Sequence, residues 1–132
     1  MFETFYAEMI ELSTYSSSER YLVHGDFHLG NILADDRGIT ALIDWEMAMY
    51  GDFVFDLATF HLWTPSLQLP QYFLHYCKKK GVDIPNFEQR LRAALLCKSL
   101  DGLRFFAKKK DENAYLYMKK VLQKRLDGTI ES

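Results

Sequence analysis

The chain has 132 residues, of which 48% are apolar and 15% aromatic, and its formal net charge is −2. This length and composition are ordinary for one globular domain with its own core, built partly from Phe and Tyr. A cytoplasmic protein is expected, because the sequence has no apolar stretch of the roughly 20 residues that a membrane-spanning helix needs and no basic segment typical of a signal peptide.

The N-terminal part predicts a helix and then a short strand. Apolar residues recur at helical spacing over about 2–14, and the Ser-rich stretch 16–18 ends this helix. The apolar run 21–23 that follows predicts a short buried strand.

A loop and a hairpin are expected next. The loop covers 24–30, where Gly25 and Gly30 permit backbone shapes that other residues resist. The expected elements after it are a strand over 31–34, a turn over 35–38 and a returning strand over 39–43. This hairpin would bring Asp44 back beside Asn31.

The remaining sequence predicts helices. They are expected over 53–63, over 69–80, from Pro85-Asn86 onward, and over 111–126. Pro65 interrupts the first, Pro70 fits the first turn of the second, and Gly81 ends it. Gly102 predicts close packing or a slight bend within the long helix, and Asp127-Gly128 is the expected end of the last. The expected class is therefore α+β, predominantly helical, with a small hairpin beside the site.

Chemistry is most strongly indicated by the segments HGDFHLGN at 24–31 and IDWE at 43–46. The spacing H-x-D-x-x-x-x-N, followed by an Asp on the next strand, is the catalytic-loop pattern of kinases. Asp26 could accept the proton of a substrate hydroxyl. Asn31 and Asp44 offer one neutral and one charged oxygen, which suits Mg²⁺.

Other polar residues have more ordinary interpretations. His24 is expected to brace the loop rather than bind metal, whereas His28 lies either near the transferred phosphate or in solvent. His61 and His75 are expected to be structural or exposed. Cys77 and Cys97, in no metal-binding or C-x-x-C pattern, are expected to be reduced thiols; no Ser has the G-x-S-x-G setting of a hydrolase.

Charge is unevenly distributed along the chain. Residues 1–66 have 11 acidic and 2 basic side chains, and residues 67–132 have 7 and 14. The acidic half suits Mg²⁺ and a cationic small-molecule substrate, or is simply a solvated surface. The Lys runs 78–80 and 108–110 lie near expected helix C-termini, where cations are favoured. No nucleic-acid motif accompanies them, so no nucleic-acid partner is expected.

The segments HGDFHLGNIL, IDWE, Gly51-Asp52 and Asp56-Leu57-Ala58 resemble the aminoglycoside phosphotransferase family, small-molecule relatives of protein kinases, and the resemblance covers about residues 5–125. It implies a kinase-like C-terminal lobe that uses ATP and Mg²⁺ to phosphorylate a hydroxyl of an aminoglycoside of the hygromycin type. It implies that Asp26 is the catalytic base, that Asn31 and Asp44 hold Mg²⁺, that His28 assists near the γ-phosphate, and that Asp56 holds the loop through its backbone amides.

Three features of the sequence differ from the kinase or family pattern. Glu46 stands where protein kinases have the Gly of D-F-G, which this family commonly allows, and Phe53 stands where the family often has Pro. In addition, only 23 residues precede His24. The resemblance therefore implies that 1–132 form the C-terminal lobe alone, without the nucleotide-binding N-terminal lobe. Such a chain is expected to fold, to be a very weak kinase alone, and to pair with a second copy or a separately encoded N-terminal lobe.

Two other hypotheses stay open at this point. One is a kinase of another small alcohol, such as choline, homoserine or a ketosamine, on the same fold. The other is a non-catalytic remnant that keeps the motif but binds a partner through its uncovered surface.

Overall fold

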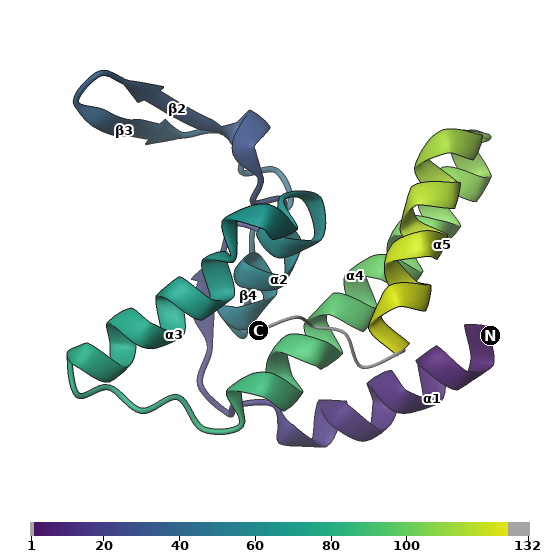
Figure 1. Ribbon diagram of the computed structural model, residues 1–132, viewed down its shortest axis with the longest axis horizontal. Coiled ribbons are helices and arrows are strands. Elements are labelled where there is room, and N and C mark those ends of the chain that lie inside the picture. The colour runs from purple at the N-terminus through teal and green to yellow at the C-terminus, as the bar shows by residue number, and fades with distance from the viewer. Residues whose placement is uncertain (1, 127–132) are drawn as a thin grey trace.

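The computed structural model describes residues 2–126, which form a helical body from which one β-hairpin extends (Figure 1). The helices are α1 (Phe2–Leu12), α2 (Val54–Trp63), α3 (Leu69–Lys79), α4 (Phe87–Lys109) and α5 (Glu112–Leu126), and the strands are β1 (Tyr21–Val23), β2 (Ile32–Asp35), β3 (Gly38–Leu42) and β4 (Met49–Gly51). Single 3-10 turns lie at Ser13–Tyr15, Leu29–Asn31 and Pro65–Leu67. The expected class and the expected helices are confirmed to within about two residues. The predicted end at Asp127-Gly128 lies outside the described residues.

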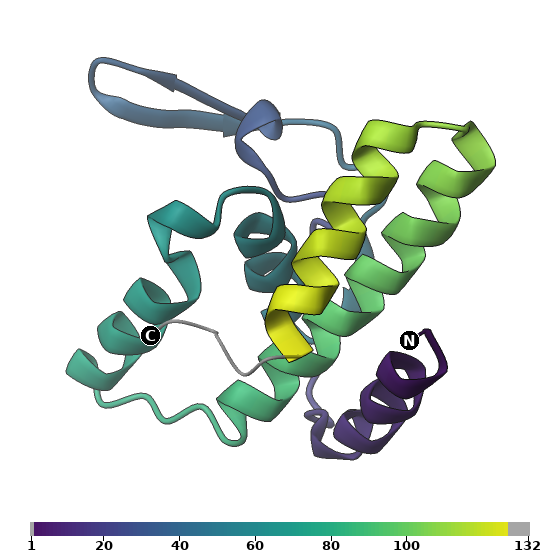
Figure 2. The same ribbon diagram turned by 45° about the vertical axis from the view of Figure 1, so that its right-hand side comes forward.

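The core is organised around α4, which packs against α1, α2 and α5. Its Leu95 and Leu96 are almost fully buried, as is Leu122 of α5. Figure 2 shows α4 and α5 side by side, and α1 also runs beside α4. An ion pair between Glu8 and Arg92 joins α1 to α4. Within residues 2–126, no helix is both long and apolar enough to span a membrane.

Gly102 allows the close approach of α4 and α5 that its position predicted. A Cβ built at this residue would lie 3.1 Å from the terminal methyl carbon of Met118. Met118 is itself 2% exposed, so its side chain fills the space that a larger residue at 102 would need. The glycine thus contributes packing between the two helices.

The strands form two separate antiparallel pairs. The hairpin β2–β3 pairs Ile32 with Leu42, as expected. β1 pairs instead with β4, a short strand that the sequence did not predict. The expectation that 21–23 is buried is wrong for Tyr21 and Leu22, which are 42% and 62% exposed, because a two-stranded pair covers only part of its surface.

A bidentate ion pair between Asp52, just before α2, and Arg90, in the first turn of α4, joins the starts of the two helices. Arg90 donates from Nε and Nη2 to the two carboxylate oxygens of Asp52, at 2.8 and 2.7 Å, and from Nη1 to the Pro85 carbonyl. Asp52 also accepts the backbone N–H of Val54 in the first turn of α2. Burial alone would raise the pKa of Asp52, but the hydrogen bonds from Arg90 and Val54 outweigh it and lower that pKa.

Candidate active site

The loop between β1 and β2 is held through its backbone by a carboxylate from α2. The two oxygens of Asp56 accept the N–H groups of His24, at 2.8 Å, and Gly25, at 3.0 Å. Gly25 has φ +88°, and a Cβ there would lie 2.1 Å from the Met47 carbonyl oxygen, so only glycine fits. The loop therefore follows one backbone path, which is fixed by the helical body.

His24 lies inside this loop and is 2% exposed. Its Nδ1 accepts the backbone N–H of Asp26 at 3.2 Å, and its Nε2 lies 2.8 Å from the Ile43 carbonyl. These partners assign the proton of the ring to Nε2, because a carbonyl only accepts. The Trp45 ring packs against it at a centroid distance of 4.6 Å. The imidazole thus connects the loop with the end of β3, and both of its nitrogens are engaged by protein atoms.

Asp26, His28 and Asn31 form one cluster at the end of the loop. The side-chain amide of Asn31 donates to the Asp26 carbonyl at 2.9 Å and lies 3.3 Å from its Oδ2. His28 Nε2 lies 3.5 Å from the same oxygen. No described residue hydrogen-bonds to Oδ1 of Asp26, and 40% of this side chain is exposed. One carboxylate oxygen is therefore oriented by neighbours while the other can accept from a ligand.

His28 also has a local role that the sequence did not indicate. Its Nδ1 accepts the N–H of Gly30 at 3.0 Å, which caps the 3-10 turn Leu29–Asn31. A Cβ at Gly30 would approach the ring to 2.8 Å, so a larger residue there would displace the His28 ring. In the neutral ring this contact leaves the proton on Nε2, which lies 3.5 Å from Asp26 Oδ2 and 3.3 Å from the Asn31 amide nitrogen.

The end of the hairpin brings the backbone just before Asp44 against the backbone of Asn31. The N–H of Ile43 donates to the Asn31 carbonyl at 2.9 Å, and Asp44 follows with φ +61°. Within residues 2–126 the Asp44 carboxylate forms no hydrogen bond or ion pair with another side chain. Asn31 uses its NH₂ on Asp26, which leaves its Oδ1 as an acceptor. These two oxygens fit Mg²⁺, which takes few protein ligands and completes its shell with phosphate and water.

The described residues offer no cluster of three or more His, Cys, Asp or Glu side chains for a metal. A dedicated protein cage of the zinc type is therefore not formed by 2–126. The donor set of Asn31 and Asp44 needs further oxygen ligands from a substrate, which is the usual situation of Mg²⁺ bound with a nucleotide.

Lys98 of α4 is a contact of the loop that sequence reasoning missed. Its Nζ donates to the Gly25 carbonyl at 2.7 Å and lies 4.8 Å from the centre of the Phe55 ring. Leu91 and Leu95, seven and three residues before it, are both buried. A lysine in register with buried leucines on one helix face was the available signal, because such a stripe is normally apolar.

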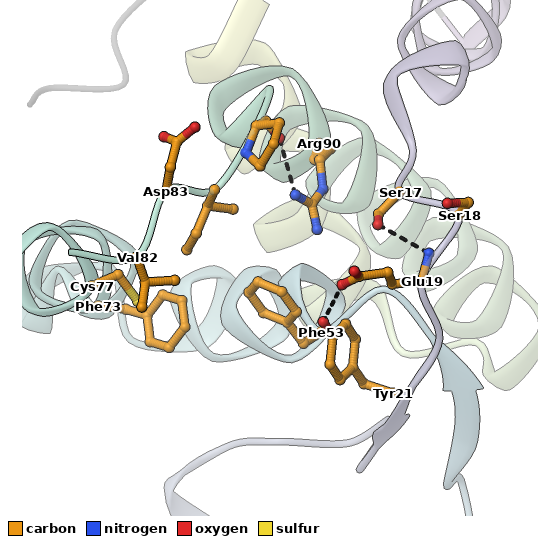
Figure 3. A pocket seen from close by; sticks show the side chains of 12 residues that line it. Ser17, Ser18, Glu19, Tyr21, Phe53, Phe73, Cys77, Val82, Asp83 and Arg90 are labelled. Atoms are coloured by element: carbon orange, nitrogen blue, oxygen red, sulfur yellow. Dashed lines mark hydrogen bonds between the residues drawn. The ribbon is translucent and has the colours of Figure 1, made fainter. Parts of the chain in front are cut away.

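A separate pocket of about 710 Å³ lies at the other end of β1 (Figure 3). Tyr21, Phe53 and Phe73 line it, together with Glu19 and Arg90. None of the cluster residues borders it. Two of its charged groups are engaged, Arg90 by Asp52 and Glu19 by the Tyr21 hydroxyl, a hydrogen bond that raises the pKa of Tyr21, and Asp83 is the one other charged residue that lines it. The chemistry therefore indicates the loop, not this hollow, as the candidate active site.

The remaining candidate residues lie apart from the loop cluster. His61 is buried in α2 and His75 is exposed on α3. Cys77, buried, and Cys97, exposed, are both free thiols. These placements agree with the structural interpretations that the sequence favoured.

Comparison with known proteins relates the chain to one family. The model of the "Phosphotransferase enzyme family" matches residues 3–96. Hygromycin-B 4-O-kinase of Escherichia coli is 38% identical over 84 residues, which cover 64% of this chain and 24% of that protein. Acyl-CoA dehydrogenase family member 11 of Rattus norvegicus is 30% identical over 95 residues, 54% of this chain and 12% of that protein. The matched region thus spans a quarter or less of these relatives.

Solved structures show the same arrangement of elements. A thermostable mutant of aminoglycoside phosphotransferase APH(4)-Ia, in ternary complex with AMP-PNP and hygromycin B, superposes with a TM-score of 0.80 at 25% identity. That match covers 99% of this chain and 44% of the other. A second structure of aminoglycoside phosphotransferase APH(4)-Ia gives 0.73 at 28% identity, covering 89% of this chain and 40% of the other. The chain spans less than half the length of either.

Proposed function

The chain belongs to the phosphotransferase enzyme family, and from this premise we propose that it forms the catalytic part of an ATP-dependent kinase of small-molecule hydroxyl groups. The resemblance inferred from HGDFHLGNIL and IDWE is confirmed at the level of the family. The observation behind the proposal is the cluster at the end of the loop. It combines a carboxylate with one open oxygen, on Asp26, and a second oxygen donor, on Asn31, and Asp44 follows the residue whose N–H binds the Asn31 carbonyl.

In this proposal Asp26 is the general base. Its Oδ2 is oriented by the Asn31 amide and faces His28, so its Oδ1 is the oxygen that accepts the hydrogen bond of the substrate hydroxyl. The hydroxyl oxygen attacks the γ-phosphorus, the bond to the ADP oxygen breaks, and the hydroxyl proton passes to Oδ1. Phosphoryl transfer depends mainly on positioning and countercharge, so the rigid backbone around Asp26 matters as much as its basicity.

Asn31 and Asp44 would hold Mg²⁺, which neutralises charge on the phosphates when it is bound. Their donor types suit this ion, and AMP-PNP in the similar ternary complex supports ATP as the phosphoryl donor. His28, whose ring is fixed by Gly30, is proposed to lie near the transferred phosphate.

The proposed acceptor is a cationic small molecule of the aminoglycoside type, as in the hygromycin-B kinase and the hygromycin complex. The excess of acidic side chains in residues 1–66 supports a cation. A second candidate is another small alcohol, because acyl-CoA dehydrogenase family member 11 contains a region similar to this chain, so similarity of this region does not by itself specify an aminoglycoside as the acceptor. The two candidates differ only in the acceptor.

An exposed apolar surface on the hairpin and the loops beside it supports a partner or a further lobe. Its members are Leu29, Leu33, Ile39, Leu42, Ile43, Trp45, Met47, Met49 and Tyr50, each at least 38% exposed. So many exposed large apolar side chains in one part of the chain often mark an interface. We propose that the nucleotide-binding lobe of a complete phosphotransferase covers it, in the same polypeptide or in another; a second copy of this chain is the alternative partner.

The test is transfer from labelled ATP to hygromycin B, other aminoglycosides, choline and homoserine by the 132-residue chain. Asp26→Asn should lower the rate by about 10²–10⁴-fold and leave binding of AMP-PNP intact. Asp35→Asn is the matched control, since Asp35 lies in the exposed hairpin turn with only Arg37 as its charged neighbour. Transfer that is equally fast in the Asp26→Asn variant would exclude Asp26 as the base, and the preferred acceptor distinguishes the two candidates.

A further inference from the structure

The peptide bond that enters Asp26 is held at both of its polar ends. Its carbonyl, on Gly25, accepts from Lys98 at 2.7 Å. Its N–H, on Asp26, donates to Nδ1 of His24 at 3.2 Å. Because a peptide unit is planar, fixing these two atoms fixes the plane from which the Asp26 side chain emerges.

This peptide is one that could otherwise rotate. Gly25 has φ +88°, and a glycine at this position populates alternative backbone conformations readily. Rotation of the Gly25–Asp26 peptide would reverse its carbonyl and change φ of Asp26, which would redirect the carboxylate. Asp56 does not prevent this motion, because it binds the N–H groups of His24 and Gly25, which precede the peptide.

Lys98 is suited to prevent that rotation. No described carboxylate lies within ion-pair distance of its ammonium group, so its partners there are the Gly25 carbonyl and the Phe55 ring. A hydrogen bond from a charged donor in a partly buried site is stronger than one between neutral groups. The helix that holds Lys98 is also the centre of the core, so the donor itself is fixed.

We propose that Lys98 is a positioning residue, which sets the direction of the catalytic Asp26 by holding the Gly25 carbonyl. The inference rests on the proposed function of Asp26. The hydrogen bond from Lys98 to the Gly25 carbonyl is observed in the structure whatever Asp26 does. Lys98 is proposed to contact neither the substrate nor the side chain of Asp26, and to act only through the Gly25 carbonyl.

The test compares three variants of the full chain. Lys98→Met keeps the apolar stem beside Phe55 and removes the donor, whereas Lys98→Arg keeps a charged donor. Lys109→Met is the matched control, because Lys109 also lies over an aromatic ring, that of Phe105 on its own helix at 5.6 Å, but does not contact the loop. Circular dichroism and thermal unfolding establish that each variant is folded.

Two measurements are made on each variant. In Lys98→Met, amide hydrogen exchange at Asp26 should become at least about tenfold faster while exchange in α4 and α5 is unchanged, since loss of the donor frees one peptide. The same variant should lose about 10- to 100-fold in kcat with KM for ATP within about twofold, because misplacing a catalytic group affects the reaction step. Lys98→Arg should recover most of both losses, and Lys109→Met should resemble wild type.

The two proposals fail separately. Unchanged exchange at Asp26 in Lys98→Met, or a loss of exchange protection spread over the whole core, would overturn the role of Lys98 whatever the activity. A wild-type chain that transfers no phosphate to the acceptors tested even when it is supplied with a nucleotide-binding lobe would count against the proposed function, while the exchange measurement would still decide on Lys98.

Discussion

Replacing Asp52 by Asn should destabilise the chain strongly, although residue 52 is not in the catalytic loop. Asp52 receives two hydrogen bonds from Arg90, whose side chain is only 4% exposed, and Asp52 itself is 21% exposed. Loss of the carboxylate charge leaves a buried guanidinium without its counterion, which costs about 3 kcal/mol or more. A domain of this size unfolds with roughly 5–15 kcal/mol, so the variant loses a large fraction of its stability.

The measurement is urea unfolding followed by circular dichroism, together with a thermal melt. At this chain length, about 3 kcal/mol corresponds to a fall in Tm of roughly 10 °C or more. Asp101→Asn is the control, because Asp101 pairs with Arg104 one turn along α4 and both side chains are more than half exposed. That exposed pair should contribute at most about 0.5 kcal/mol.

The pH dependence follows from the lowered pKa of Asp52. Its ordinary value is 3.8, and the folded value lies below this because the hydrogen bonds from Arg90 and Val54 outweigh burial. A lowered folded pKa adds stability that is complete above the unfolded value and is lost as the pH falls through the folded value. The difference between wild type and Asp52→Asn should therefore be largest at neutral pH and shrink below about pH 4. A cost at Asp52 no greater than at Asp101, or a difference independent of pH, would refute this reasoning.

Two further predictions concern the site itself. Asp44→Ala should weaken Mg²⁺-dependent binding of AMP-PNP more than Asn31→Ala does, because only the former removes a charge; titration of Mg²⁺ in each variant measures this, and an equal or larger effect at Asn31 contradicts the assignment. Gly25→Ala should cost at least about 2 kcal/mol of unfolding free energy, since alanine would need φ +88° and would meet the Met47 carbonyl. Gly51→Ala, where the nearest atom lies at 3.8 Å, should change the midpoint of urea unfolding little, and equal midpoints for the two variants would argue against a rigid loop.

The helices were predictable because each has a local signal. Apolar spacing marked their faces, and Pro and Gly marked their ends, so the predicted bounds differ from those observed by a few residues at most. The pairing of β1 with β4 was not predictable in this way. Met49-Tyr50-Gly51 is too short for a period to be recognised, and the exposure of Leu22 depends on which strand lies beside it.

The site residues likewise fall into those with a local sequence signal and those that depend on distant segments. The loop motif and the hairpin turn are local, so the approach of Asn31 to the end of β3 could be predicted from the sequence. The partners of the loop on the helical body are 31 and 73 residues from Gly25, at Asp56 and Lys98. Asp56 was anticipated only through the family resemblance, and Lys98 was not anticipated, because no spacing rule relates residues so far apart.

These long-range contacts imply that the candidate site forms only when the helical core is folded. The loop peptides that surround Asp26 are held by Asp56 on α2 and by Lys98 on α4, and Phe27 packs against Phe60 of α2 at 5.4 Å between ring centres. The hairpin projects from the body (Figure 1), and Asp44, which follows it, is held only through its neighbours Ile43 and Trp45, both of which contact His24. The loop around the base is therefore held directly by α2 and α4, whereas the proposed metal ligand Asp44 is held indirectly, through the contacts of its neighbours with His24. Since nucleotide and metal would bridge the two, ligand binding should order the hairpin more than the loop.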